Sequence, residues 1–381
     1  MVSKACLVGM YQRKLEEIAA CPDIQLTVAV PASWRDERGE VRLERTHVRG
    51  YDLVVEPLAF NGNYHLHFYP QLGRRIAQVR PDLIHIDEEP YNFATWHAMR
   101  LARRQGARSL FFTWQNLARR YPWPFSRFER DVLRQADAAI AGNEEAVAVW
   151  RGKGYRGPMP VIPQFGVDLE EFHPAQRPAR AAGGPFVVGY AGRLVPEKGV
   201  DLLLRALAQL PGDVRARVVG AGPERARLAR LAEALGVAER VEWLPLAPSV
   251  EMPGLIAGFD CLVLPSRTRP NWKEQFGRVL IEAMACGVPV VAAASGELPN
   301  VVGEAGRLFP EGDAAALAAQ LRALWQQPDL AVSLAAAGRA RVLARYTQRR
   351  VAEATVALYR SLALASSLSS ASSLPSAGNG L

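Results

Sequence analysis

Residues 273–291 read KEQFGRVLIEAMACGVPVV. Gly277 stands just before an apolar run that predicts a helix over 278–285, and a strand is predicted over 288–292. Helices that alternate with short apolar strands predict a doubly wound parallel sheet. A glycine at a helix entrance lets a ligand approach the backbone closely. The N–H groups of the first helical turn then form an anion site suited to a diphosphate.

Two glutamates flank this helix entrance. Glu274 precedes the turn, and Glu282 lies on the helix, just over one turn beyond its start. A carboxylate before the turn can hold sugar hydroxyls, and one on the inner face of the helix can accept hydrogen bonds from ribose hydroxyls. Two ordinary surface glutamates are the alternative. The glycine at the entrance and the apolar strand that follows favour a binding site.

A second stretch, residues 187–199, reads VVGYAGRLVPEKG. A predicted strand ends at Gly192, and Arg193 and Lys198 bracket the turn before the next helix. Open α/β sheets bind ligands at the carboxyl ends of their strands. Two cations there can neutralise the charge on a leaving diphosphate, as a magnesium ion does elsewhere. We therefore expect no metal and no cofactor. A solvated basic loop is the alternative for Lys198 taken alone.

Together these stretches resemble the retaining GT-B glycosyltransferases of family 4 (glycosyl transferases group 1). The resemblance implies an α/β fold with two Rossmann-like, doubly wound parallel-sheet domains facing a cleft, and a C-terminal helix that crosses back to the first domain. It implies that Arg193, Lys198 and Glu274 are the catalytic residues, the two cations on the donor phosphates and the glutamate on the transferred sugar. The donor-binding residues that it implies are Gly9, Gly192, Gly220, Phe276, Gly277, Arg278, Val279 and Glu282.

The first half of the chain departs from the family pattern. Gly9 stands alone where members usually carry a glycine pair, and Gln115 stands where many members have a histidine. Glutamine cannot act as a base. Retention by a same-face, oxocarbenium-like route needs none, because the leaving phosphate can take the acceptor proton. The candidate contacts to sugar or acceptor are Gln115, Asn116, His65 and Glu89 of the acidic run 87–89, for which a solvated acidic turn is the alternative.

The pattern of elements divides the chain into five parts. We predict an N-terminal acceptor-binding domain over 1–172, a Pro/Gly/Ala-rich linker over 173–185 and a nucleotide-sugar-binding domain over 186–345. A crossover helix is predicted over 346–365, and residues 366–381, which carry no charge, are expected to be a disordered tail.

Three predicted elements within these parts are tested below. Ala5–Gly9 and Met159–Ile162 are short apolar runs that predict strands. The last long helix is predicted to run from near Ala331 toward Ala363, with a kink.

Composition and charge limit the location and the binding partners that the protein can have. The 381 residues carry a formal charge of +8 and contain neither a run long enough to span a membrane nor a signal peptide, so a cytoplasmic protein is expected. Arg100, Arg103, Arg104 and Arg108 have helical spacing. They form either a solvated helix face or one attracted to anionic lipid or to a phosphorylated acceptor, which would place the protein at the inner membrane surface. No motif supports nucleic-acid binding.

The function that these residues predict is retaining transfer of a hexosyl group from a UDP- or GDP-linked sugar to a glycan or lipid-linked acceptor, in cell-surface polysaccharide or glycolipid biosynthesis. A sugar-nucleotide epimerase of the same architecture is the main alternative, and it would need an acid and a base in the first domain. An NAD-dependent oxidoreductase lacks its glycine fingerprint here. A non-catalytic sensor would be expected to have lost Glu274 or Arg193.

Overall fold

The computed structural model describes residues 1–36, 39–176 and 184–371, and gives side chains as far as residue 364. The chain forms two compact units. Unit 1 contains Met1–Phe165 and the chain from Gln348 onward, and unit 2 is Gly166–Thr347. Residues 177–183 of the predicted linker and 372–381 of the predicted tail lie outside the described residues.

Unit 2 is built on a six-stranded sheet in which every pair of neighbouring strands is parallel. Across the sheet the strands are β10 (Val241–Leu244), β9 (Val214–Val219), β8 (Phe186–Ala191), β11 (Cys261–Leu264), β12 (Val290–Ala293) and β13 (Arg307–Phe309). All residues of β11 and β12 are buried, as expected of strands covered on both faces. The strand order reverses between β8 and β11, which is where open α/β sheets bind ligands.

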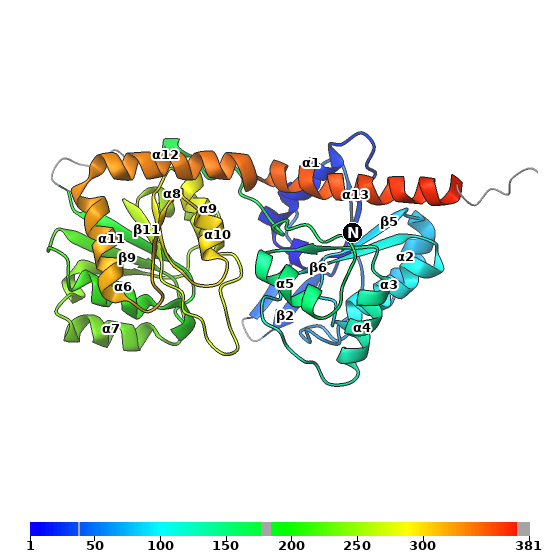
Figure 1. Cartoon of the computed structure of the whole chain (residues 1–381), viewed down its shortest axis with the longest axis horizontal. Helices are drawn as coiled ribbons and strands as arrows, with labels where there is room; N and C mark the ends of the chain where they lie inside the picture. Colours follow the sequence, from blue (N-terminus) through cyan, green and yellow to red (C-terminus); the bar gives the residue numbers. More distant parts are fainter. Residues whose placement is uncertain (37–38, 177–183, 372–381) are drawn as a thin grey trace, which may run out of the picture. The chain divides into compact units, whose positions relative to one another are not determined.

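Helices cover both faces of this sheet (Figure 1). They are α6 (Val200–Leu207), α7 (Arg225–Ala234), α8 (Met252–Ala257), α9 (Arg278–Ala285), α10 (Leu298–Val302), α11 (Ala314–Gln326) and α12 (Pro328–Arg345). Helix α6 packs against α7 and α11, whereas α9 packs against α8 and α12. The helix predicted over 278–285 is confirmed.

Unit 1 contains a second parallel sheet. Its strands are β1 (Thr27–Val30) paired with β4 (Asp52–Val55), and β5 (Leu83–Ile86), β6 (Arg108–Thr113) and β7 (Ala138–Ala141) paired in that order. Val2 joins the two groups by bridging Ala29 of β1 and Ile86 of β5. The prediction of two α/β units with parallel sheets is thus confirmed.

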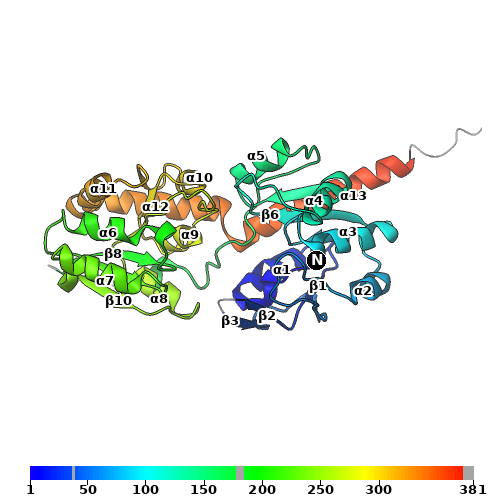
Figure 2. The same cartoon turned by 90° about the horizontal axis from the view of Figure 1, so that it is seen from below.

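Alternating side chains of β6 supply two separate cores, one on each face of the sheet. Phe111 packs into a cluster formed with α2 (Leu72–Val79), α3 (Phe93–Arg104), α4 (Phe125–Gln135) and α5 (Glu144–Gly152). Leu110 and Phe112 pack into a cluster formed with α1 (Arg13–Ala19) and α13 (Gln348–Ala371). Figure 1 shows α1 on the side of this sheet opposite α3 and α4, and Figure 2 shows the same unit from below. This period-two alternation is the expected signature of a strand covered on both faces.

The sequence patterns misplaced several elements. Ala5–Gly9 is not a strand. It folds into the 3-10 turns η1 (Ala5–Leu7) and η2 (Gly9–Gln12). Val2 already fills the place in the sheet between β1 and β5, and the apolar side chains of the turns are buried without being part of a strand. Met159–Ile162 is not a regular strand, but it lies parallel to β7, through a bridge between Val161 and Ala141 and a hydrogen bond from the Ile162 N–H to the Ala141 carbonyl at 2.9 Å. Short apolar runs do not distinguish strands from buried turns.

The predicted C-terminal helix is two helices. The helical conformation is interrupted at Tyr346 and Thr347, between α12 and α13. The Val167 N–H donates to the Tyr346 carbonyl there, at 2.7 Å. Helix α13 continues to Ala371, so the first part of the predicted disordered tail is helical, as its Ala and Leu content permits. The β2 (Ser33–Asp36) and β3 (Gly39–Arg42) hairpin was not predicted. None of the described helices combines the length and apolar character needed to cross a bilayer.

Candidate functional site

A largely buried ion pair lies at the carboxyl edge of the unit 2 sheet. Lys198 ends the turn that follows β8, and Glu274 precedes α9. The Lys198 Nζ is 2.6 Å from the Glu274 Oε2, and Ser266 donates its hydroxyl to the same oxygen at 2.7 Å. The Lys198 Nζ also lies 5.1 Å from the centroid of the Trp272 ring. The reversal in strand order therefore brings together two of the three residues predicted to be catalytic.

The start of α9 has the geometry of the predicted anion site. Gly277 is the N-cap residue, with φ of +75°, and an added Cβ would lie 2.5 Å from the Leu298 Cδ2. Only glycine fits this combination of conformation and space. The N–H groups of the first turn of a helix point out of its N-terminus, and the favourable end of the helix dipole attracts an anion there.

Glu282 lies one turn into α9 and is buried. Burial raises the pKa of its carboxyl, and the ion pair with Arg278, at 2.8 Å from Nε to Oε1, opposes that shift. A buried carboxylate with a single nearby cation can accept hydrogen bonds from neutral hydroxyl groups, as predicted for Glu282.

The loop after β8 lies directly against the loop after β9. Gly192 and Leu194 donate their N–H groups to Val219 and Ala221, at 3.0 and 2.9 Å, and a Cβ at Gly220 would lie 1.9 Å from the Gly192 oxygen. The glycine at 220 is therefore required by backbone packing. Beside it, the exposed Arg193 forms no ion pair with any described residue.

Gly296 holds the backbone beneath Glu274. Its φ is +53°, a Cβ added to it would lie 2.2 Å from the Glu274 carbonyl oxygen, and Glu297 donates its N–H to that oxygen at 3.1 Å. We expect Gly296→Ala to lower the free energy of unfolding by about 2 kcal/mol or more, because the backbone must move to admit the methyl group. Calorimetry of the full chain measures this. Gly212→Ala is the matched control, since its Cβ meets no atom within 4 Å, and equal melting temperatures for the two variants would contradict the expectation.

Unit 1 has its own pocket, of about 290 Å³, at the carboxyl edge of its sheet. One wall is the acidic run 87–89, which follows β5, and the aromatic residues are Tyr11, Trp34, Tyr64, Phe112 and Trp114. Lys4 is the only cation among the described residues that line it. We call this the acidic pocket.

The three carboxyl groups of the acidic pocket have different hydrogen-bond and ion-pair partners. Ser3 and Gln164 donate to Asp87 at 2.6 and 2.9 Å. Burial opposes ionisation of Glu88, but Lys4 and His67 outweigh it and lower the pKa of Glu88 to about 2.

Glu89 accepts hydrogen bonds from the Thr113 hydroxyl at 2.6 Å and the Trp114 N–H at 2.8 Å. Burial nevertheless raises the pKa of Glu89 to about 7. The pocket thus contains one strongly acidic and one weakly acidic carboxyl group.

The other residues predicted for unit 1 are engaged elsewhere. Gln115 donates to the Leu117 carbonyl at 3.0 Å and accepts from the Tyr121 hydroxyl at 2.7 Å, and Asn116 donates to Glu145 at 3.1 Å. The Gly9 N–H donates to Glu44 at 2.6 Å.

His65 packs against aromatic rings, whereas the neighbouring His67 has its Nε2 3.6 Å from the Glu88 Oε1. Of the predicted acceptor contacts, only Glu89 lines the acidic pocket. Trp34 also lines this pocket. It lies on the β2–β3 hairpin, which the sequence pattern did not predict, so Trp34 was not a candidate site residue.

Helices α2, α3 and α4 pack side by side (Figure 1), and the arginines that they expose form a basic surface. We call it the basic face, and its exposed arginines are Arg74, Arg100, Arg103, Arg104, Arg127, Arg130 and Arg134. The acidic residues of these helices are partly buried and paired, Glu129 with Lys153 and Asp131 with Arg127. Arg108, predicted to share this face, instead begins β6 and pairs with Asp137.

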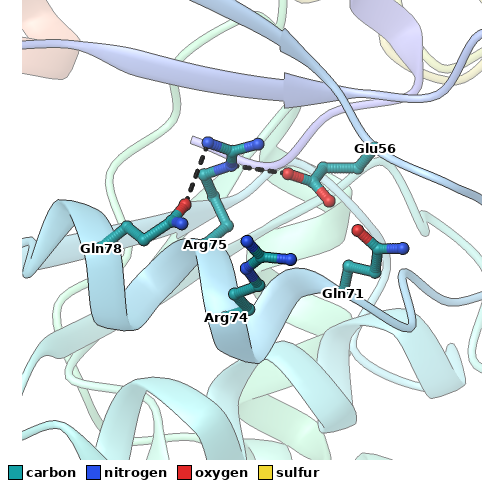
Figure 3. Close-up of a pocket in the computed structure, with 5 residues that line it drawn as sticks. All are labelled: Glu56, Gln71, Arg74, Arg75 and Gln78. Atoms are coloured by element: carbon teal, nitrogen blue, oxygen red, sulfur yellow. Dashed lines mark hydrogen bonds and ion pairs between the residues drawn. The ribbon is translucent and has the colours of Figure 1, made fainter.

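A pocket of about 200 Å³ lies beside α2 within this surface (Figure 3). Arg75 is held there by Glu56 at 2.7 Å and by Gln78 at 3.2 Å. Arg74 forms no ion pair with any described residue, so its charge is available to an anion. In the described parts of the chain, no three His, Cys, Asp or Glu side chains are arranged to hold a metal ion.

Two family models match the chain. The model described as "Glycosyl transferases group 1" matches residues 173–341, and the model described as "Glycosyltransferase Family 4" matches residues 18–171.

The chain is also similar to curated D-inositol 3-phosphate glycosyltransferases. The one from Mycobacterium marinum is 37% identical over 253 residues, which are 61% of this chain and 52% of the relative. The one from Mycobacterium tuberculosis is 40% identical over 186 residues, 46% of this chain and 37% of the relative. The chain thus matches about half the length of these relatives, or less.

Solved structures share the fold over nearly the whole chain. HepE of Anabaena in complex with UDP has a TM-score of 0.73 at 21% identity, and the match covers 94% of this chain and 98% of HepE. Sucrose-phosphate synthase from Thermosynechococcus elongatus has a TM-score of 0.70 at 25% identity and covers 93% of each chain. These likenesses confirm the predicted two-unit architecture.

Proposed function

Because the chain belongs to the family 4 glycosyltransferases of the GT-B fold, we propose that it transfers a hexosyl group from a nucleotide-diphosphate sugar to a glycan or lipid-linked acceptor. Transfer proceeds with retention at the anomeric carbon and without a metal ion. The observation that carries the proposal is the meeting of Lys198, Glu274 and the α9 entrance at the point where the unit 2 strand order reverses.

We assign each group of the unit 2 site a role in this reaction. The first-turn N–H groups of α9, with Lys198 and the exposed Arg193, bind the diphosphate and stabilise the charge that develops on it as the sugar leaves. Glu274 accepts hydrogen bonds from the hydroxyls of the transferred sugar, and Glu282 accepts from the ribose. No base is needed, because the departing phosphate oxygen can take the acceptor proton on the face where it leaves.

UDP-glucose is the first donor to test. HepE has been solved with UDP and with UDP-glucose, and its architecture covers almost all of this chain. In a thermal-shift screen, the true donor stabilises the folded state by about 2.7 kcal/mol at a hundredfold excess over its Kd. A nucleotide-sugar panel that leaves the melting temperature unchanged would contradict the proposal.

Chelation is expected to leave the reaction intact. With the diphosphate neutralised by side chains and backbone N–H groups, 5 mM EDTA should change the initial rate by less than about twofold. The measurement is donor consumption before and after chelation, with NMR of the product to establish the anomeric configuration. Loss of the rate that added Mg²⁺ or Mn²⁺ restores, or an inverted product, would contradict the proposed mechanism.

The basic face suits a lipid-linked acceptor, which would give the enzyme a role in cell-surface polysaccharide or glycolipid assembly. Its arginines complement the negative surface of an anionic bilayer, where each basic residue contributes about 1 kcal/mol. We expect the protein to sediment with vesicles containing anionic lipid and not with neutral phosphatidylcholine vesicles. Arg103→Glu with Arg104→Glu should weaken this binding tenfold or more.

The matched control for vesicle binding changes the net charge equally. Arg225→Glu with Arg230→Glu places the same substitutions on α7 of unit 2, where both side chains are exposed. Equal loss of binding in the two variants would mean that the net charge of the protein, and not the basic face, governs vesicle binding. It would contradict the proposal that the basic face binds the membrane.

The acidic pocket is the one feature that favours an alternative function, sugar-nucleotide epimerisation. An epimerase of this architecture needs an acid and a base in the first unit, and Glu88 and Glu89 have pKa values of about 2 and about 7. Incubating the donor with the enzyme and no acceptor distinguishes the two activities. A second sugar epimer in the NMR spectrum would support the epimerase, and an unchanged donor supports the transferase.

A further inference from the structure

We propose that the acidic pocket of unit 1 binds the acceptor through an uncharged glycosyl unit and excludes acceptors that are phosphorylated on that unit. This inference rests on the proposed function and specifies its substrate class. It comes from the charges, the hydrogen bonds and the rings of the pocket.

The charge balance of the pocket disfavours an anion. Among the described lining residues, three carboxyl side chains, at 87–89, face a single cation, Lys4. That cation is already committed, because it pairs with Glu88 and its Nζ lies 5.3 Å from the Trp34 ring centroid and 5.7 Å from the Tyr64 ring centroid. Phosphate recognition relies on cationic donors with unused hydrogen bonds. A phosphate in this pocket would meet carboxylates instead.

The same pocket offers acceptors that fit hydroxyl groups. The Glu88 side chain is 2% exposed, and its Oε1 accepts no hydrogen bond from the described residues, the His67 Nε2 being 3.6 Å away. A buried carboxylate oxygen left without a donor is costly. A neutral sugar hydroxyl supplies that donor without adding charge. Asp87 and Glu89, each already held by two donors, retain lone pairs beside it.

Aromatic side chains complete the fit. Trp34 comes from the β2 strand, Tyr64 from the segment before α2, and Trp114 from the end of β6. Flat rings beside hydrogen-bond acceptors suit the apolar C–H faces and the polar edge of a pyranose ring. The volume of about 290 Å³ lies near the lower end of small-ligand pockets, roughly 300 Å³ and upward. One glycosyl unit is therefore the expected occupant.

Direct binding tests the inference without turnover. Saturation-transfer NMR on the full chain would compare neutral hexosides with the same hexosides carrying a 6-phosphate. We expect the neutral compounds to bind about tenfold or more tightly than their phosphate esters. Equal or tighter binding of the esters, or no binding by any neutral hexoside, overturns the inference.

Variants test whether the pocket itself discriminates. Glu88→Gln releases Lys4 from its partner, so neutral hexosides should bind more weakly, phosphorylated ones more tightly, and the ratio of their affinities should fall about tenfold. Tyr64→Leu removes an exposed ring and should weaken neutral binding even if the buried Glu88 variant fails to fold. Glu144→Gln, the same change on the exposed start of α5, is the control. An unchanged ratio in Glu88→Gln, or unchanged neutral binding in Tyr64→Leu, contradicts the assignment.

Failure of this inference is distinguishable from failure of the proposed function. Donor binding, measured by thermal shift, belongs to unit 2 and does not involve the acidic pocket. A chain that binds a nucleotide sugar but prefers phosphorylated acceptors would refute only the pocket assignment. A chain that binds no nucleotide sugar would refute the transferase, whichever hexoside occupies unit 1.

Discussion

Replacing Glu274 with glutamine is expected to lower kcat for sugar transfer by about 10²–10³-fold, the usual effect of removing one preorganised electrostatic contact to a transition state. The substitution keeps the shape of the side chain and its hydrogen bond to Ser266, but it removes the negative charge 2.6 Å from Lys198. In the proposed reaction, that charge lies where positive charge develops on the sugar as the diphosphate leaves. Steady-state kinetics with UDP-glucose measures the change, and donor affinity should alter much less than turnover.

The control for Glu274 is another glutamate of unit 2 in an ion pair. Glu242→Gln breaks a 2.6 Å pair with Arg217 on the surface of the sheet, and exposed pairs of this kind contribute little. We expect its kcat to match that of the unaltered enzyme. If Glu274→Gln retained turnover within threefold while binding donor normally, Glu274 would have no part in the reaction.

Lys198→Met should have an effect of similar size but a different kinetic signature. The ammonium group is both the partner of Glu274 and a proposed ligand of the diphosphate, so its loss should raise the donor KM and lower kcat together, with kcat/KM falling about a hundredfold or more. Methionine preserves most of the volume beside Trp272. Isothermal titration with UDP gives the ground-state part of the loss, and kinetics gives the remainder.

A double variant separates the two roles of Lys198. If Lys198 acted only by holding Glu274, the combined Lys198→Met and Glu274→Gln variant would be no worse than either single variant. Because we expect Lys198 also to contact the diphosphate, the double variant should bind UDP as weakly as Lys198→Met and lose turnover beyond both. Arg230→Met, on the exposed face of α7, controls for the loss of one positive charge. Normal UDP affinity in Lys198→Met would remove the phosphate role.

The fold was largely predictable where elements repeat a simple period. The helix predicted over 278–285 matches α9, and the strand predicted over 288–292 overlaps β12, because amphipathic helices and wholly apolar strands have distinct patterns. The errors fell on short segments whose burial comes from tertiary packing. Ala5–Gly9 is apolar because its turns face the α1 and α13 core, and nothing local separates that from a strand.

The unit 2 site was predictable for a different reason. Arg193, Lys198, Gly277 and Glu282 lie within two short motifs at strand and helix ends, and parallel sheets bring such ends to one edge. The acidic pocket draws on segments from residue 4 to residue 164, whose proximity depends on the whole topology. The turn that begins at Asn63 is also invisible in the sequence pattern: its carbonyl groups, from Asn63 and Tyr64, lie 3.1 and 3.0 Å from the His67 Nδ1, and His67 rather than His65 lies near Glu88.

The position of α13 in the chain bears on how the protein is made. Val351, Val356, Tyr359 and Leu362 fill the core beside α1, and the Tyr359 hydroxyl lies 2.6 Å from the buried His85 Nδ1. During translation these side chains leave the ribosome only after all of unit 2. Unit 2 can therefore finish folding before unit 1. Until α13 is synthesised, the apolar face of unit 1 that α13 covers stays exposed to solvent.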